Sequence, residues 1–281
     1  MRFCSALTAL LLVANVGAAA ADHAWPTTAH ETLAERFAPP DGYRRTAAPD
    51  GSFAAWLRQL PVLPGRPPVT LWNGQPKGNQ TAHAAVLDID VGKRDLQQCA
   101  DAVMRLRAEY LKAAGKPSKI CFHLSDGSLA AWTDWQIGYR PRMQGKRMQF
   151  VRTAAANSSY KAFRQYLDLV FSYAGSMSLS RELSRVPTVR NIEAGDVFVK
   201  GGFPGHAVIV LDVAERDDGE RVFLLAQSYM PAQQIHVLRN PNDASAWYHT
   251  SDEAPLLTPE WAFAPVSLHR FPNRNCESNA R

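Results

Sequence analysis

The chain has 281 residues, of which 46% are hydrophobic and 20% are charged. This composition excludes a disordered or fibrous protein. The formal net charge is +5, and the basic residues are interspersed with acids instead of forming a block, so the sequence gives no support to nucleic-acid binding.

The first 21 residues have the three parts of a secretory signal peptide. Arg2 precedes an apolar run over residues 6–16, and small residues follow at 18–21. We expect cleavage near Ala21, which removes one positive charge and leaves a periplasmic or secreted protein of residues 22–281. The apolar run is too short to span a bilayer, so we expect no integral membrane segment. A mildly basic exported protein suits an anionic envelope polymer as its partner.

Residues 22–70 are rich in proline and glycine and predict an N-terminal wrap around a larger body. Within the wrap, Ser52 is a suitable N-cap for a short helix over residues 53–60. The next segment, residues 82–124, predicts three elements in the order strand, helix, strand. These are a strand over 85–91, a helix opened by Asp95 with Gln98 three residues on and ending near residue 114, and a strand over 120–124.

Residues 126–157 carry aromatic and basic side chains among turn formers and predict a long, partly irregular surface segment. An amphipathic helix is expected over residues 160–174. From Gly195 onward the pattern is typical of strands, over residues 196–199, 206–213, 222–229 and 234–238, with glycine-rich turns between them. We therefore expect one α+β domain over 22–281 whose core, residues 82–281, ends in an antiparallel meander.

The meander contains the most specific motif of the chain. Gly195-Asp196 opens one strand, Gly205-His206 opens the next, and Gln227 lies on the third. An imidazole held in one tautomer by a side chain on a neighbouring strand can act as a general base. Gln227 is the predicted orienting group for His206, because Ser228 would face the opposite side of the sheet.

This motif resembles that of the papain-like cell-wall hydrolases of the NlpC and CHAP types. The resemblance implies a papain-like antiparallel sheet packed against helices, here with an N-terminal extension. It also implies an exported hydrolase that cleaves an amide or peptide bond in peptidoglycan by a cysteine and histidine mechanism, without a cofactor or metal. Over most of the mature chain, the stretches GGFPGHAVIVLDVA and LLAQSYMPAQ also resemble an exported bacterial family catalogued as a domain of unknown function.

The nucleophile is left open by the sequence. In the resembled hydrolases a cysteine opens the helix before the Gly-Asp strand, whereas Ser158 and Ser159 occupy that place here. Cys99 is the available cysteine, near the start of the helix that Asp95 opens. It could instead belong to a buried helical face or to a disulfide. Either serine is a further alternative, and a catalytically silent papain-fold protein that binds wall fragments or an envelope protein is the alternative function.

The mature chain has an odd number of cysteines, Cys99, Cys121 and Cys276, so at least one is unpaired within the chain, and their pairing is left open. Cys121 and His123 share a strand face, but no second pair at ligand spacing accompanies them, and we expect no metal site. The oligomeric state is also left open.

Overall fold

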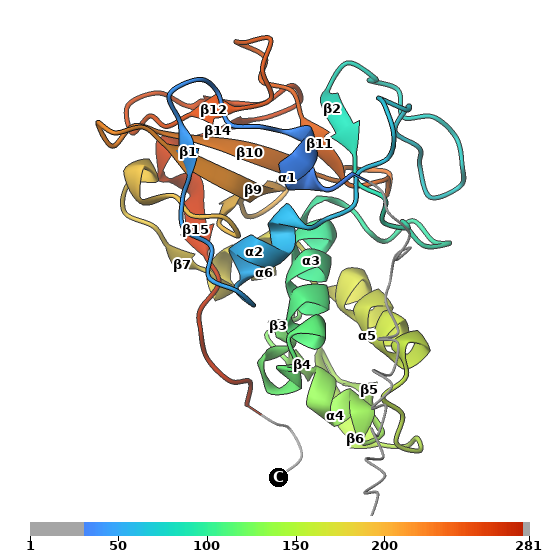
Figure 1. Ribbon diagram of the computed structural model, residues 1–281. Helices are drawn as coiled ribbons and strands as arrows, with labels where there is room; N and C mark the ends of the chain where they lie inside the picture. Colours follow the sequence, from blue (N-terminus) through green and yellow to red (C-terminus); the bar gives the residue numbers. More distant parts are fainter. Residues whose placement is uncertain (1–30, 278–281) are drawn as a thin grey trace, which may run out of the picture.

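The structure is a computed structural model that describes residues 31–277. The predicted signal peptide lies outside the described residues. A central antiparallel sheet forms one layer, and helices pack below it as Figure 1 is drawn. The sheet order is β2 (His83–Val86), β11 (His236–Leu238), β10 (Arg221–Gln227), β9 (His206–Glu215), β8 (Val197–Lys200), β15 (Leu268–Arg270) and β7 (Ser184–Arg185), with β1 (Arg44–Arg45) on β9 and β12 (Tyr248–His249) on β10. The predicted meander is confirmed, because β8, β9, β10 and β11 are successive antiparallel neighbours.

The remaining elements are helices and three small hairpins. The α-helices are α1 (Leu33–Arg36), α2 (Phe53–Arg58), α3 (Cys99–Ala113), α4 (Trp132–Gln136), α5 (Tyr160–Tyr173) and α6 (Ser176–Glu182). The hairpins are β3 (Cys121–His123) with β4 (Leu129–Ala131), β5 (Tyr139–Gln144) with β6 (Arg147–Arg152), and β13 (Leu256–Leu257) with β14 (Ala262–Phe263). Short 3₁₀ turns are η1 (Pro117–Lys119), η2 (Val189–Asn191) and η3 (Pro265–Ser267). This content confirms the α+β class, and no helix among residues 31–277 is long and apolar enough to cross a membrane.

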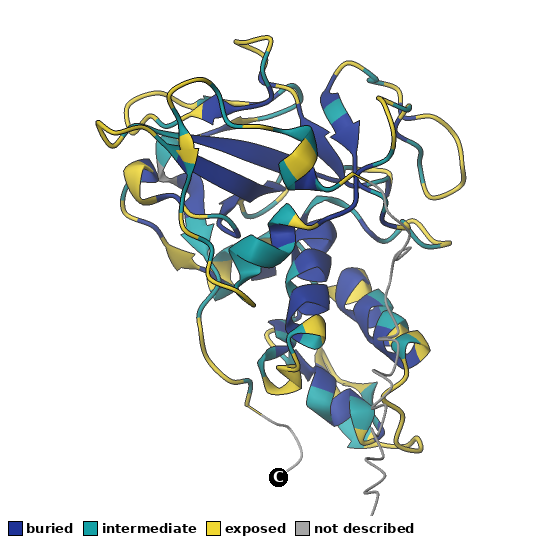
Figure 2. Ribbon diagram, viewed as in Figure 1, coloured by how far each residue is buried: buried dark blue, intermediate teal, exposed yellow. Residues whose placement is uncertain are grey.

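Successive side chains of the central strands point to opposite faces of the sheet, and both faces are covered by packed residues. On β9, Ala207 and Ile209 join the core shared with the helices, whereas Val208 and Val210 pack on the other side with Phe263 and neighbouring apolar residues. Figure 2 shows β9, β10 and the upper part of α3 as largely buried. The predicted amphipathic helix is also confirmed, since α5 buries its apolar stripe in the core beneath the sheet.

The N-terminal segment is fixed to the sheet by charge as well as by strand pairing. Asp212 on β9 is fully buried and accepts hydrogen bonds from Arg45 Nε and Arg58 Nε, each at 2.7 Å. Arg45 lies on β1 and Arg58 ends α2. Two guanidinium groups from the N-terminal segment thus converge on one carboxylate of the central strand.

Two expectations for residues 82–157 were wrong in detail, and one is confirmed. The strand expected over 85–91 ends at Val86, because Val86 pairs with His236, the first residue of β11, and Leu87 forms an isolated bridge with Val62. The strand expected over 120–124 is confirmed as β3, which pairs with β4 in a small hairpin. Residues 126–157 are largely regular, forming β4, α4 and the β5–β6 hairpin, because Trp132 and Trp135 are buried and anchor the segment.

Candidate functional site

His206 and Gln227 meet at one end of the central sheet. His206 is the first residue of β9 and Gln227 is the last residue of β10, and both side chains are buried. His206 Nε2 lies 2.8 Å from Gln227 Oε1. Ser228 faces the other side, where its hydroxyl donates to the carbonyl of Gln97 at 2.8 Å. The predicted adjacency of His206 and Gln227, and the opposite orientation of Ser228, are therefore confirmed.

A carboxylate that sequence reasoning missed fixes the Gln227 amide. Gln227 Nε2 donates to Glu260 Oε2 at 2.7 Å, and Lys77 Nζ forms an ion pair with the other oxygen of Glu260. Because an ionised carboxylate only accepts hydrogen bonds, the amide NH₂ must face Glu260 and the amide oxygen must face His206. Nothing in the sequence indicates this contact, since Glu260 is 33 residues from Gln227.

The orientation of Gln227 determines which tautomer of His206 is present. An amide oxygen accepts, so His206 Nε2 must carry the proton, and Nδ1 is left with the lone pair that can act as a base. The ring lies among aromatic side chains, with centroids at 4.8 Å from Tyr229, 5.3 Å from Trp261 and 5.8 Å from Phe263. This burial lowers the pKa of His206 to about 4, so the imidazole is neutral at neutral pH.

Cys99 lines the same pocket as His206. The pocket has a volume of about 460 Å³, and its walls include Tyr229, Trp261 and Phe171 of α5. Cys99 is the first residue of α3, at the positive end of the helix dipole. The helix therefore does not open at Asp95 as expected. Gln98 is the N-cap, and its N–H donates to Asp101 at 3.0 Å, whereas Asp95 accepts from Ala232 outside the helix.

The Cys99 thiol is protonated in this environment. Burial raises its pKa to about 11, the nearby Asp101 adds to the rise, and the backbone N–H groups of Ala207 and Ala100 partly offset it. No hydrogen bond joins the thiol to the His206 ring, although both groups line the pocket. The site at rest thus holds a neutral thiol and a neutral imidazole.

Asp101 is a second unusual group in the pocket wall. It is buried, and one of its oxygens, Oδ1, has no hydrogen-bond partner. Burial raises the pKa of this carboxyl well above its usual range, and hydrogen bonding to the Gln98 backbone opposes the rise.

The other candidate nucleophiles are not in this pocket. Cys121 and Cys276 form a disulfide, so Cys99 is the free cysteine among the described residues. Ser159 caps α5 by accepting the N–H of Ala162 at 3.2 Å, whereas the opposite end of that helix contributes to the pocket wall. Since α5 has 14 residues, Ser158 and Ser159 lie roughly 20 Å away along the helix axis.

The alternative that Cys99 belongs to a buried helical face is only partly correct. Val103, Leu106 and Tyr110 on the same helix are buried in the core, but Cys99 itself is partly exposed at the pocket end of that stripe. At the pocket mouth, Phe203 is 98% exposed and Met230 is 62% exposed, so the entrance is apolar.

The matching family model covers most of the chain. A family described as a domain of unknown function (4846) matches residues 33–270. Neither the curated proteins nor the solved structures gave a match. This coverage confirms the predicted membership in a family of unknown function: the chain belongs to the family described as domain of unknown function (4846).

Proposed function

We propose that this protein is an exported thiol-dependent hydrolase that cleaves an amide bond in the peptide part of peptidoglycan. Cys99 is the proposed nucleophile, His206 the general base and Gln227 the residue that orients the base. The observation that carries the proposal is the chain of contacts from Glu260 through Gln227 to His206. These contacts leave the lone pair on Nδ1 of a ring that lines the same pocket as Cys99.

The proposed reaction needs only these groups and water. His206 Nδ1 takes the thiol proton while Cys99 Sγ bonds to the carbonyl carbon, and the carbonyl electron pair moves to oxygen. The C–N bond then breaks, and His206 gives the proton to the leaving amine. A water molecule deprotonated by His206 hydrolyses the thioester, releasing a carboxylic acid, and the proton returns to Cys99. The positive end of the α3 dipole favours the negative charge that develops beside Cys99.

The arrangement of elements supports a papain-like fold. A cysteine opens a helix, the helix packs under an antiparallel sheet, and the following strands supply the histidine and the amide. The Cys121–Cys276 disulfide supports the proposed export, because disulfides persist in oxidising compartments such as the periplasm.

A catalytically silent protein that binds wall fragments is the second candidate. The observation in its favour is the resting state of the pocket, in which the pKa of Cys99 is about 11 and no hydrogen bond connects the thiol to His206. A pocket of about 460 Å³ with an apolar mouth can bind a ligand without attacking it.

Digestion of purified peptidoglycan distinguishes the two candidates. The wild-type protein, Cys99→Ser, His206→Ala and the control Ser158→Ala are each incubated with sacculi, and released muropeptides and new amines are measured by chromatography and mass spectrometry. Product from the wild type and the control, but not from the Cys99 and His206 variants, supports the hydrolase. Retention on sacculi without product from any of the four contradicts it and favours the silent binder.

A further inference from the structure

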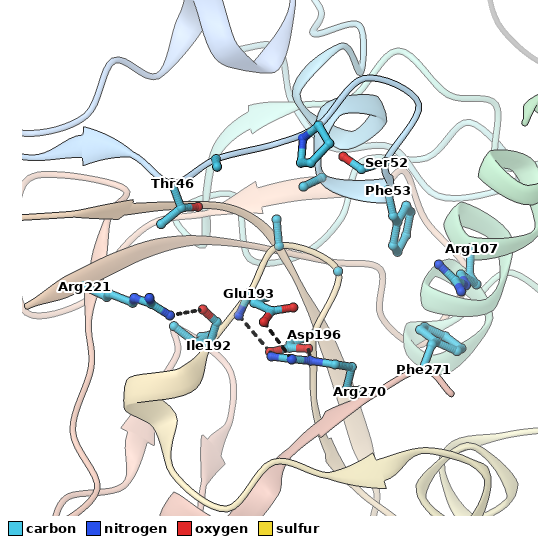
Figure 3. Close-up of a pocket in the computed structure, with 15 residues that line it drawn as sticks. Thr46, Ser52, Phe53, Arg107, Ile192, Glu193, Asp196, Arg221, Arg270 and Phe271 are labelled. Atoms are coloured by element: carbon cyan, nitrogen blue, oxygen red, sulfur yellow. Dashed lines mark hydrogen bonds and ion pairs between the residues drawn. The ribbon is translucent and has the colours of Figure 1, made fainter. Parts of the chain in front are cut away.

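A second pocket, of about 440 Å³, opens between α2, the middle of α3 and the start of β8. Figure 3 shows Arg107 between the rings of Phe53 and Phe271 on one side, and Arg270 facing Asp196 and Glu193 on the other. We infer that this pocket binds a small monoanionic ligand through its carboxylate, with Arg107 as the carboxylate-binding residue. This inference does not depend on the proposed hydrolase activity.

Arg107 is held by aromatic rings instead of by acids. Its guanidinium carbon lies 5.1 Å from the ring centre of Phe53, 5.4 Å from Tyr110 and 5.3 Å from Phe271. Among residues 31–277, no carboxylate or carbonyl forms a hydrogen bond or ion pair with this guanidinium. The rings hold the guanidinium at the pocket wall, and its N–H donors have no partner among the described residues.

The other arginines of this region have acidic partners. Arg105, two residues earlier on α3, contacts Asp90 at 2.8 Å. Arg270 binds both oxygens of Asp196 at 2.7 and 2.8 Å, and Arg221 binds Glu215 at 2.6 Å. Arg107 therefore stands out as a cation that the described part of the chain leaves without a counter-ion.

The charge of the pocket wall selects the class of ligand. Of the three arginines in the wall, Arg221 is paired with Glu215, and Arg270 with Glu193 and Asp196, so Arg107 is the cation that a ligand anion can neutralise. A guanidinium matches a carboxylate with two parallel hydrogen bonds. A phosphate dianion would bring a second negative charge near Glu193 and Asp196.

The rings and the location define the rest of the site. Phe53 and Phe271 offer apolar surface beside the guanidinium, so the preferred ligand carries an apolar group next to its carboxylate, as an N-acyl amino acid does. Arg107 is eight residues from Cys99 along α3, or roughly 12 Å, and the two pockets have no lining residue in common.

Titration calorimetry with N-acetylphenylalanine tests the inference. We compare this probe with its uncharged amide and with inorganic phosphate, using the full mature protein. Arg107→Gln and Arg107→Lys are the test variants, and Arg142→Gln, an exposed arginine on the β5–β6 hairpin, is the matched control. Melting curves show whether each variant is folded.

We expect the carboxylate to bind with a dissociation constant below about 1 mM, and the amide and phosphate to bind at least about tenfold more weakly. Arg107→Gln should weaken carboxylate binding at least about tenfold, and the control should not change it. If Arg107→Gln does not fold, Arg107→Lys decides, because lysine keeps the charge but loses the bidentate fork. The inference is overturned if the wild type does not bind N-acetylphenylalanine at about 10 mM, if phosphate binds as well, or if the folded Arg107 variant binds like the control.

Discussion

The protonation state of Cys99 is the property of the candidate site that alkylation tests most directly. Burial raises the thiol pKa from its ordinary value of 9.0 to about 11, so at neutral pH the thiolate fraction is about 100-fold smaller than that of an exposed thiol. Because the thiolate is the form that reacts, iodoacetamide should label Cys99 about 100-fold more slowly than it labels a free cysteine. The labelling rate, measured by mass spectrometry of the Cys99 peptide, should rise with pH to a midpoint near 11.

Asp101→Asn is the matched perturbation. Asp101 contributes to the raised pKa of Cys99, and asparagine keeps an oxygen that can accept the Gln98 N–H, so the variant should lower the alkylation midpoint. Asp217→Asn changes an exposed carboxylate and serves as the control. A wild-type midpoint near that of a free thiol, or an unchanged midpoint in Asp101→Asn, would refute the reasoning from burial and charge.

Asp101→Asn should also change how the free energy of unfolding depends on pH. The folded-state pKa of Asp101 is raised, so above about pH 4, its usual range, the unfolded chain loses this proton while the folded chain keeps it. The free energy of unfolding should therefore fall as pH rises, by at most about 1.4 kcal/mol per pH unit from this group. Urea unfolding of Asp101→Asn should lack this part of the decline. An identical pH dependence in both proteins would contradict the raised pKa.

If the protein hydrolyses amides, the acid limb of kcat/KM should lie near pH 4, the pKa of His206, because the base must be neutral; a limb near 6.5 would contradict its burial. Asp212→Ala should cost about 3 kcal/mol in urea unfolding, because it leaves two partly buried arginines facing each other; a loss below about 1 kcal/mol would count against that role. Gly195→Ala should destabilise the fold by more than about 1 kcal/mol, because Gly195 has a φ of +97° and an added Cβ would lie 2.5 Å from the Phe53 ring; a variant as stable as the wild type would be inconsistent with this contact.

The elements that sequence reasoning found are those with a clear local pattern. Side chains of the meander strands alternate between two buried faces, and α5 has a continuous apolar stripe. The spacing of apolar residues in the sequence was therefore enough to identify both. His206 and Gln227 were found together because neighbouring strands in a meander bring them into contact. The start of α3 was predicted wrongly because aspartate is a common N-cap residue. In the structure the Asp95 carboxylate instead accepts the backbone N–H of Ala232, from a distant loop.

The parts that were missed depend on tertiary contacts. Glu260 and Lys77 come from opposite ends of the chain and meet only when the fold is complete. Residues 126–157 were expected to be irregular because their aromatic side chains have no simple period, yet packing of Trp132 against Phe163 and Tyr166 of α5 gives them regular structure. Composition indicates that such side chains are present, and it does not indicate what they contact.

The motif that suggested a function is divided between two sites in the structure. Gly205-His206 borders the pocket of Cys99, whereas Gly195-Asp196 borders the pocket of Arg107. The division follows from the register, because β8 and β9 are antiparallel and the N–H of Gly195 donates to Val210, four residues after His206. Both carboxylate oxygens of Asp196 also accept hydrogen bonds from Arg270, so Asp196 does not belong to the His206 site. The resemblance rests on both halves of the motif, but only the second half, Gly205-His206, supports the candidate chemistry. The first half, Gly195-Asp196, is explained by the fold and by the proposed ligand of the Arg107 pocket.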